Sequence, residues 1–202
     1  MHMQRTKSDR CMYFKLGDFS DINTGYSLRP STSDGDIKII QPKNIDDFGN
    51  ISFGNLQKAD VPRLKDQSLE SGDVLLVSRG RPLALVFTNK PSNKIVASSS
   101  FLRIRLNNNS VVTPEYLVQY LNSTAGRTAL SKHQTHSSTI PMITKTELMD
   151  LEIPIPSIEN QKKLTALGQG FDRFRIFHGI QLKLYETMVN NTMNKITGEN
   201  DG

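Results

Sequence analysis

Few side chains in this sequence have the types and spacing of a catalytic or metal-binding site. His133 and His136 are three residues apart, but no cysteine or carboxylate stands beside them to complete a metal site. Surface hydrogen bonding is the commoner role of such a pair. Asp36-Ile37-Lys38, with Asp21 upstream, has the spacing of an Asp/Glu-x-Lys nuclease site. Because three-residue matches of this kind arise by chance, we keep a metal-dependent nuclease as an alternative and predict no metal site and no cofactor.

Other signatures of catalysis are missing from the sequence. It has no glycine-rich phosphate loop ending in Gly-Lys-Ser/Thr, no Rossmann glycine triplet and no Gly-x-Ser-x-Gly elbow. The Asn/Asp-Pro-Pro-Tyr/Phe signature of adenine methyltransferases is also absent. The single cysteine, Cys11, excludes an intramolecular disulfide and a thiolate zinc cluster. We therefore predict a protein that is not an enzyme.

Basic residues are concentrated in the middle third of the chain. The 202 residues include 25 Lys+Arg and 20 Asp+Glu, a formal charge of +5. Residues 74–146 contain nine basic residues and one acid, Glu115, a net charge of +8, whereas residues 1–73 (10 against 11) carry −1 and residues 147–202 (6 against 8) carry −2. A surface of this kind attracts polyanions such as nucleic acids. A solvated basic face without a partner is the alternative.

The elements that must position these residues indicate a mixed α/β fold. The expected strands are residues 36–40, 51–53, 74–77, 83–87, 95–97 and 101–106. Alternation in the last strand places Arg103 and Arg105 on one face. Thr113-Pro114 begins one helix, and Thr144 with Glu147 has the capping-box form that begins a short helix ending at Met149. The prolines of 153–156 keep that segment extended.

A proline-free C-terminal segment carries apolar residues at the helical period. Their mean spacing is about 3.6 residues, and they are Leu164, Leu167, Phe171, Phe174, Phe177, Ile180, Leu184, Met188, Met193 and Ile196. The proline-free stretch runs from Ile158 to Ile196, and as one helix it would be roughly 57 Å long. The alternative is a helix folded back at 168–170 or at 178–179. A row of apolar side chains left facing water favours association. We therefore predict a homodimer through Leu164, Leu167, Phe171, Phe174, Phe177, Ile180, Leu184 and Met188.

The composition also bears on location. No apolar run approaches the ~20 residues needed to span a bilayer, and the N-terminus has no apolar signal region. One cysteine is typical of a reducing compartment. We therefore expect a cytoplasmic protein without membrane contact.

Four segments, in order, resemble the specificity (S) subunit of type I restriction-modification systems. The first is Gln41-Pro42-Lys43-Asn44-Ile45 with Gly49-Asn50-Ile51, and the second runs from Leu69 to Gly80. The third is Pro114-Glu115-Tyr116-Leu117 to Leu121-Asn122-Ser123. The fourth runs from Ser138-Thr139-Ile140-Pro141 through Ile153-Pro154-Ile155-Pro156 to Gln161-Lys162-Lys163-Leu164. Four blocks in the same order make the resemblance specific.

The resemblance implies a non-catalytic reader of double-stranded DNA, with a curved α/β target recognition domain followed by a helix. Methylation and cleavage then belong to partner methyltransferase (modification) and restriction subunits. We find no second recognition domain and helix here, so we expect a half-length form. The expected divisions are an N-terminal extension (1–12), the recognition domain (13–156), the long dimerisation helix (157–197) and a disordered tail (198–202). An orphan DNA-interaction or anti-restriction protein is a further alternative.

Pairing of two copies would rebuild the two-domain arrangement. Antiparallel helices place the two readers about a two-fold axis, which predicts a bipartite palindromic target. The helices would fix the gap between half-sites at roughly one DNA turn. We expect a four-residue insertion near Tyr185 to change the preferred gap or abolish binding.

The predicted DNA contacts come from loops and from one strand face. Arg79 and Arg81 follow a strand and could grip guanine or contact phosphate only. Asn44 could read adenine or cap a turn, and Arg103 and Arg105 could be plain surface charge. Tyr26 and Arg29 lie in a loop matching a variable part of the family. The full predicted set is Tyr26, Arg29, Lys43, Asn44, Ser78, Arg79, Arg81, Lys94, Arg103, Arg105, Lys132, His133, Gln134, His136 and Ser137.

Overall fold

The computed structural model describes residues 11–27, 35–46, 49–61, 67–88, 95–133 and 141–197. The chain divides into two compact units, residues 1–165 and residues 166–202. The division falls nine residues after the expected boundary at 156, because the first turns of the long helix belong to the first unit. The expected tail (198–202) lies outside the described residues, as does the N-terminal extension apart from Cys11 and Met12.

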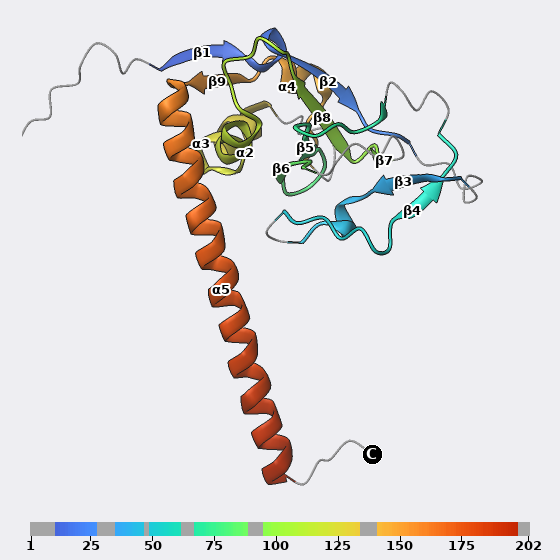
Figure 1. Ribbon diagram of the computed structural model, residues 1–202, viewed down its shortest axis with the longest axis vertical. Coiled ribbons are helices and arrows are strands. Elements are labelled where there is room, and N and C mark those ends of the chain that lie inside the picture. The colour runs from blue at the N-terminus through green and yellow to red at the C-terminus, as the bar shows by residue number, and fades with distance from the viewer. Residues whose placement is uncertain are drawn as a thin grey trace, which may run out of the picture. The chain divides into compact units, whose positions relative to one another are not determined.

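Three small sheets build the first unit (Figure 1). The strands β1 (Met12–Lys15) and β9 (Glu152–Ile155) form an antiparallel pair. An antiparallel four-stranded sheet has the order β2 (Ser20–Thr24), β8 (Phe101–Leu106), β5 (Val74–Val77) and β6 (Ala84–Val86). In the third sheet, β3 (Ile37–Ile40) lies between antiparallel β4 (Gln57–Ala59) and parallel β7 (Ile95–Ala97). The chain is thus a mixed α/β protein.

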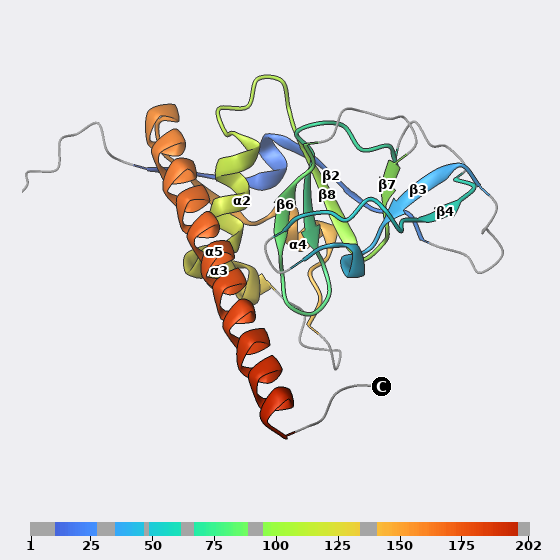
Figure 2. The same ribbon diagram turned by 60° about the horizontal axis from the view of Figure 1, so that its bottom comes forward.

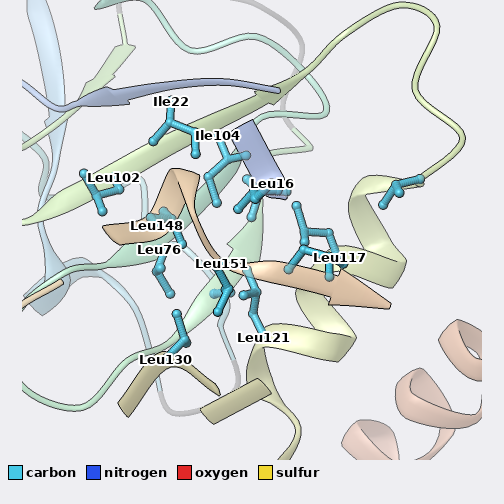
Figure 3. Packing of buried hydrophobic residues seen from close by; sticks show 14 of the residues in the cluster. Leu16, Ile22, Leu76, Leu102, Ile104, Leu117, Leu121, Leu130, Leu148 and Leu151 are labelled. Carbon is cyan, nitrogen blue, oxygen red and sulfur yellow. The ribbon is translucent and has the colours of Figure 1, made fainter. Parts of the chain in front are cut away.

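The four-stranded sheet is buried on both faces at its strand β5. Val74 and Leu76 join one hydrophobic cluster, while Leu75 and Val77 join a second. All four side chains are buried, which explains the continuous apolar run of this strand. Figure 3 shows the first cluster, in which Leu76 lies among leucines from β8, α2 and the segments that follow.

The helices α2 (Pro114–Asn122), α3 (Thr124–His133) and α4 (Lys145–Met149) complete the first unit. Thr113 caps α2, since its hydroxyl accepts from the Tyr116 N–H at 3.2 Å, and Thr144 with Glu147 forms the predicted capping box of α4. Short 3₁₀ turns span Leu16–Asp18 (η2) and Pro42–Asn44 (η3). Figures 1 and 2 show α2 beside β6, at the opposite end of this unit from β3 and β4, and α3 packs against α2.

Some element predictions were wrong or incomplete. Residues 51–53 form no strand, since Ile51 makes only an isolated bridge to Ile45, and the strand comes later at β4. The polar sequence of β4 hides it from a hydrophobic pattern. The strands β1 and β2 and the helix α3 were not predicted. Ser123 is the overlooked signal for α3, because its hydroxyl accepts from the Gly126 N–H at 3.1 Å in the first turn.

The long helix α5 runs without interruption from Ile158 to Thr197. The alternative of a helix folded back at one of its glycines is therefore wrong, which agrees with the small cost of one exposed glycine, about 1 kcal/mol. Among the described helices, none has both the length and the hydropathy that crossing a bilayer requires.

Candidate nucleic-acid interface

Two exposed arginines follow directly after the buried strand β5. Arg79 and Arg81 are exposed to solvent and flank Gly80, whose φ of +78° is a conformation that side-chain-bearing residues rarely adopt. The chain therefore leaves the core through a tight turn with a cation on each side. This is the loop position expected from the sequence.

Hydrogen bonds join this arginine loop to a segment 60 residues further along the chain. The Gly80 N–H donates to the Pro141 carbonyl at 3.0 Å, and the Ile143 N–H donates to the Ser78 carbonyl at 2.9 Å. Arg79 also forms an isolated bridge with Met142. The structure thus places the arginine loop against residues 141–143. This segment begins three residues after the stretch 132–138, which contains five of the predicted DNA contacts and is called the polar run below.

The other end of that run is the C-terminus of α3. Lys132, in the last turn of α3, is exposed, and His133 is its last residue. The predicted contacts Gln134, His136 and Ser137 lie outside the described residues, as do Arg29, Lys94 and the side chain of His133. The described structure therefore joins the arginine loop to residues 141–143 and provides an exposed lysine, Lys132, at the start of the run.

Helix α2, which leads into α3, is tied to the sheet by the amide of its last residue, Asn122. The Asn122 side chain accepts from the Ala84 N–H at 2.9 Å and donates to the Ala84 carbonyl at 2.8 Å. These bonds satisfy backbone groups of β6, an edge strand of the four-stranded sheet. A Cβ on Gly126 would lie 2.0 Å from the Tyr120 carbonyl oxygen, so the turn from α2 into α3 requires glycine.

Arg103 and Arg105 do share a strand face, as predicted, but neither is plain surface charge. Arg105 makes two hydrogen bonds of 2.7 Å to the buried Asp73 carboxylate and another of 2.7 Å to Glu70. These bonds and the nearby negative charge raise the pKa of the Arg105 guanidinium. Arg103 is only 5% exposed and lies 3.3 Å from both Asp21 and the Ser68 carbonyl. We therefore withdraw both arginines from the DNA-contacting set.

Three other predicted contacts have structural roles. Ser78 is buried, and its hydroxyl donates to the Ser100 carbonyl at 3.0 Å, so it is not available to DNA. Asn44 is also buried, and its side-chain oxygen accepts from the Gln41 N–H at 2.9 Å, which confirms the capping interpretation. Tyr26 is half-buried, with its hydroxyl donating to the Asp60 carbonyl at 3.2 Å. Lys43 remains exposed on η3.

Within the described residues, two further cations of the basic third were not among the predicted contacts. Lys145, at the start of α4, is exposed and donates to the Asn23 side chain at 3.2 Å. Arg127 lies half-buried in α3, a helix that the sequence analysis did not foresee. Lys145 lies two residues after the segment 141–143, which bonds to the arginine loop. This proximity is the signal that would have added Lys145 to the predicted DNA contacts.

The residues of the nuclease alternative lie in different sheets. Asp21 is on β2 with its carboxylate on Arg103, whereas Lys38 is on β3 and Asp36 directly precedes that strand. Within the described ranges no three His, Cys, Asp or Glu side chains are grouped to bind a metal ion. The part of the chain that the structure describes offers this alternative no assembled site.

The predicted dimerisation residues all lie on α5 and are exposed in the single chain. Their exposed fractions run from 47% for Leu164 to 72% for Leu167. Seven of the eight belong to the second unit, where helix α5 has apolar side chains in contact with solvent along its length. These exposed apolar side chains therefore still call for a partner surface that buries them.

Comparisons with known proteins agree with this geometry. Residues 9–184 match the family described as the type I restriction modification DNA specificity domain. The specificity subunit of the type I restriction enzyme MjaIX from Methanocaldococcus jannaschii is 29% identical over 167 residues, which are 78% of this chain and 37% of that protein.

Solved structures show the same fold at low identity. The HsdS subunit from Thermoanaerobacter tengcongensis has a TM-score of 0.60 at 19% identity, covering 85% of this chain and 39% of that one. A chain from a type I R-M system solved for complex assembly and conformational transition has a TM-score of 0.62 at 19% identity, covering 96% and 45%. The S subunit from M. genitalium has a TM-score of 0.53 at 14% identity, covering 96% and 46%. The chain thus spans less than half the length of these relatives.

Proposed function

The chain belongs to the family of type I restriction-modification DNA specificity domains, and from this premise we propose that it is the DNA-reading specificity subunit of such a system. The family description is one of recognition, in line with the prediction that the protein is not an enzyme. Chemistry on the bound DNA is then the work of methyltransferase and restriction subunits that this chain directs. We expect the assembly to act in the cytoplasm.

One observation carries the proposal: backbone hydrogen bonds join the arginine loop to residues 141–143, which follow the polar run in the sequence. Phosphate contacts position a protein on the duplex, and base contacts specify the sequence. The guanidinium group of Arg79 or Arg81 can donate two hydrogen bonds to guanine O6 and N7. Exposed Lys132 and Lys145 can bind phosphate groups. A rigid sheet behind the loop holds the two arginines in place, as specific readout requires.

The relatives are more than twice as long as this chain. That length suits a protein that contains two recognition units and two long helices. We propose that two copies of this chain supply the same set by pairing through α5. A two-fold axis then relates the recognition units, and the target is a bipartite palindrome. Apolar side chains of α5 that the pairing leaves uncovered suit the methyltransferase subunit.

Selection of bound duplexes from a random pool tests the proposal. We expect the protein to enrich one bipartite sequence, and Arg79→Ala/Arg81→Ala to lower affinity for it at least tenfold, as for lost base or paired phosphate contacts. The control, Lys162→Ala/Lys163→Ala, removes the same charge from exposed positions on α5 and should keep the affinity.

The salt dependence then separates the two roles left open for these arginines. Loss of two phosphate contacts lowers the slope of log K against log salt by about 2, whereas loss of base contacts relaxes the selected sequence. A pool that yields no enriched duplex, or equal losses in both double variants, would contradict the proposal.

A further inference from the structure

Beyond the four-stranded sheet, the end of β5 continues into a short two-stranded ribbon. The ribbon consists of residues 78–80 and 141–143, and its two backbone hydrogen bonds lie on either side of the bridge between Arg79 and Met142. This is the pattern of a non-hydrogen-bonded antiparallel pair, in which the Cα atoms are about 4.5 Å apart and the side chains lie close together. Arg79 and Met142 are therefore direct neighbours on one face of the ribbon.

The two faces of the ribbon differ in exposure, because successive residues of an extended strand point to opposite sides. On the inner face, Ser78 is 6% exposed and Ile143 is 2% exposed. Ile143 belongs to the first hydrophobic cluster, and the Ser78 hydroxyl donates to the Ser100 carbonyl. On the outer face, Arg79 is exposed and Met142 is half-buried. A ribbon anchored from below on both strands thus presents an arginine and a methionine side by side.

Cations flank this outer pair on both strands of the ribbon. Arg81 and Lys145 follow the paired residues by two and three positions, and both are exposed. The sequence has no Asp or Glu at positions 74–88 or 141–146. The major groove of DNA is about 12 Å wide and admits a two-stranded β-ribbon. The centre of this ribbon therefore suits base edges, and its flanks suit the phosphates that border the groove.

We propose that the ribbon enters the major groove of the target and reads a guanine with Arg79 and a thymine with Met142. This inference rests on the proposed function and specifies the bases that its site takes. The Arg79 guanidinium donates to guanine O6 and N7. The apolar, polarisable side chain of Met142 packs on the 5-methyl group of thymine. Cross-strand neighbours have Cβ atoms about 5 Å apart and successive bases are about 3.4 Å apart, so the two bases lie one or two steps from each other.

Base analogues in the enriched duplex test the two contacts on the full chain. Within one half-site, each thymine is replaced in turn by uracil, which lacks the methyl group, and each guanine by 7-deazaguanine, which lacks the N7 acceptor. Uracil at the contacted thymine should lower affinity about fourfold, as for one buried methyl group. This penalty should vanish in Met142→Ala and persist in Met142→Leu. One or two steps away, a 7-deazaguanine penalty of at least about fivefold should vanish in Arg79→Ala.

Two control variants separate these contacts from general effects. Met149→Ala truncates a methionine that is 40% exposed at the end of α4, away from the ribbon, and should keep both penalties. Arg81→Ala should also keep both penalties and lower the slope of log K against log salt by about 1. Each penalty is a ratio of two affinities measured on one variant, so a lower fraction of folded protein leaves it unchanged.

Four results would overturn the inference: no uracil penalty that depends on residue 142, affected bases more than two steps apart, loss of the penalty in Met149→Ala, or loss of all binding in Met142→Ala, which exceeds one methyl contact. In each case the parent protein still selects its duplex, so the proposed function stands. A pool without an enriched duplex removes the proposed function and this inference with it.

Discussion

At the scale of single residues, the chain uses its arginines in two distinct ways. Arg79 and Arg81 are exposed in a loop, whereas Arg103 and Arg105 lie under residues 68–73 and pair with carboxylates. Asp73, which is 1% exposed, accepts from both Arg105 and the Glu70 N–H at 2.7 Å. The second pair of arginines therefore maintains the sheet from which the first pair projects.

Substitution of Asp73 should test this structural role. In Asp73→Asn the guanidinium of Arg105 loses its buried countercharge, and we expect a loss of about 3 kcal/mol in the free energy of unfolding. Urea unfolding at pH 7 measures it. Glu70→Gln, at the exposed partner of the same arginine, should cost less than about 1 kcal/mol. Equal losses in the two variants would argue against the buried pair as the main contribution.

Tyr116 should make stability depend on alkaline pH. Burial raises the pKa of its phenol to about 12, and its hydroxyl donates to the Pro154 carbonyl at 2.5 Å. The unfolded phenol titrates near 10, so this stabilisation is complete below about pH 10 and is lost as the pH rises toward 12. Tyr116→Phe should cost about 1 kcal/mol at pH 7 and make the decline above pH 10 less steep. Urea unfolding at pH 7, 9 and 11 measures both effects, with the exposed Tyr185→Phe as the control.

At the scale of elements, Gln161 attaches the start of α5 to the recognition unit. It is fully buried, and its side-chain oxygen accepts from the Thr113 N–H at 3.0 Å. Its amide nitrogen donates to the carbonyls of Val111 at 2.7 Å and Pro156 at 3.0 Å. One side chain therefore joins the beginning of α2, the end of the β9 segment and the first turn of α5.

Loss of this amide should leave three backbone groups without partners. We expect Gln161→Leu to lower the free energy of unfolding of the recognition unit by about 2–4 kcal/mol. The control is Gln169→Leu, the same change at an exposed position of the same helix, where the effect should stay within about 0.5 kcal/mol. Thermal unfolding followed by near-ultraviolet circular dichroism compares them, and matching stabilities would disprove the role of Gln161.

At the scale of the whole molecule, a continuous α5 should set the spacing of the two half-sites. Eleven helix-forming residues inserted between Thr165 and Ala166 add about three turns, which preserve the rotation of the helix faces, and lengthen each copy by about 16 Å. The pair then gains about 33 Å, so the preferred gap should grow by roughly one DNA turn. Selection from pools of varied gap measures it. The same eleven residues placed after Thr197, at the end of α5, should leave the gap unchanged. A shift in this control would exclude the ruler mechanism.

Local patterns were sufficient for much of this architecture. The run of β5, the caps of α2 and α4 and the 3.6-residue period of α5 depend on neighbouring residues, so they could be predicted before any contact was known. The strand at 57–59 could not, because β4 is polar. The helix at 124–133 was missed although Ser123 caps its first turn. Asn44 could be given two roles from its loop, and burial chose the capping role.

What the sequence by itself determined is the α/β class, the basic middle third and the unpartnered apolar helix, since composition and period are properties of consecutive residues. The tertiary structure alone decided which cations face solvent. Arg103 and Arg105 are paired because residues 68–73 fold over β8, and the loop of Arg79 and Arg81 is fixed because residues 141–143 return to bond Ser78 and Gly80. Both arrangements join residues at least 30 positions apart, and such pairing depends on the packed sheet.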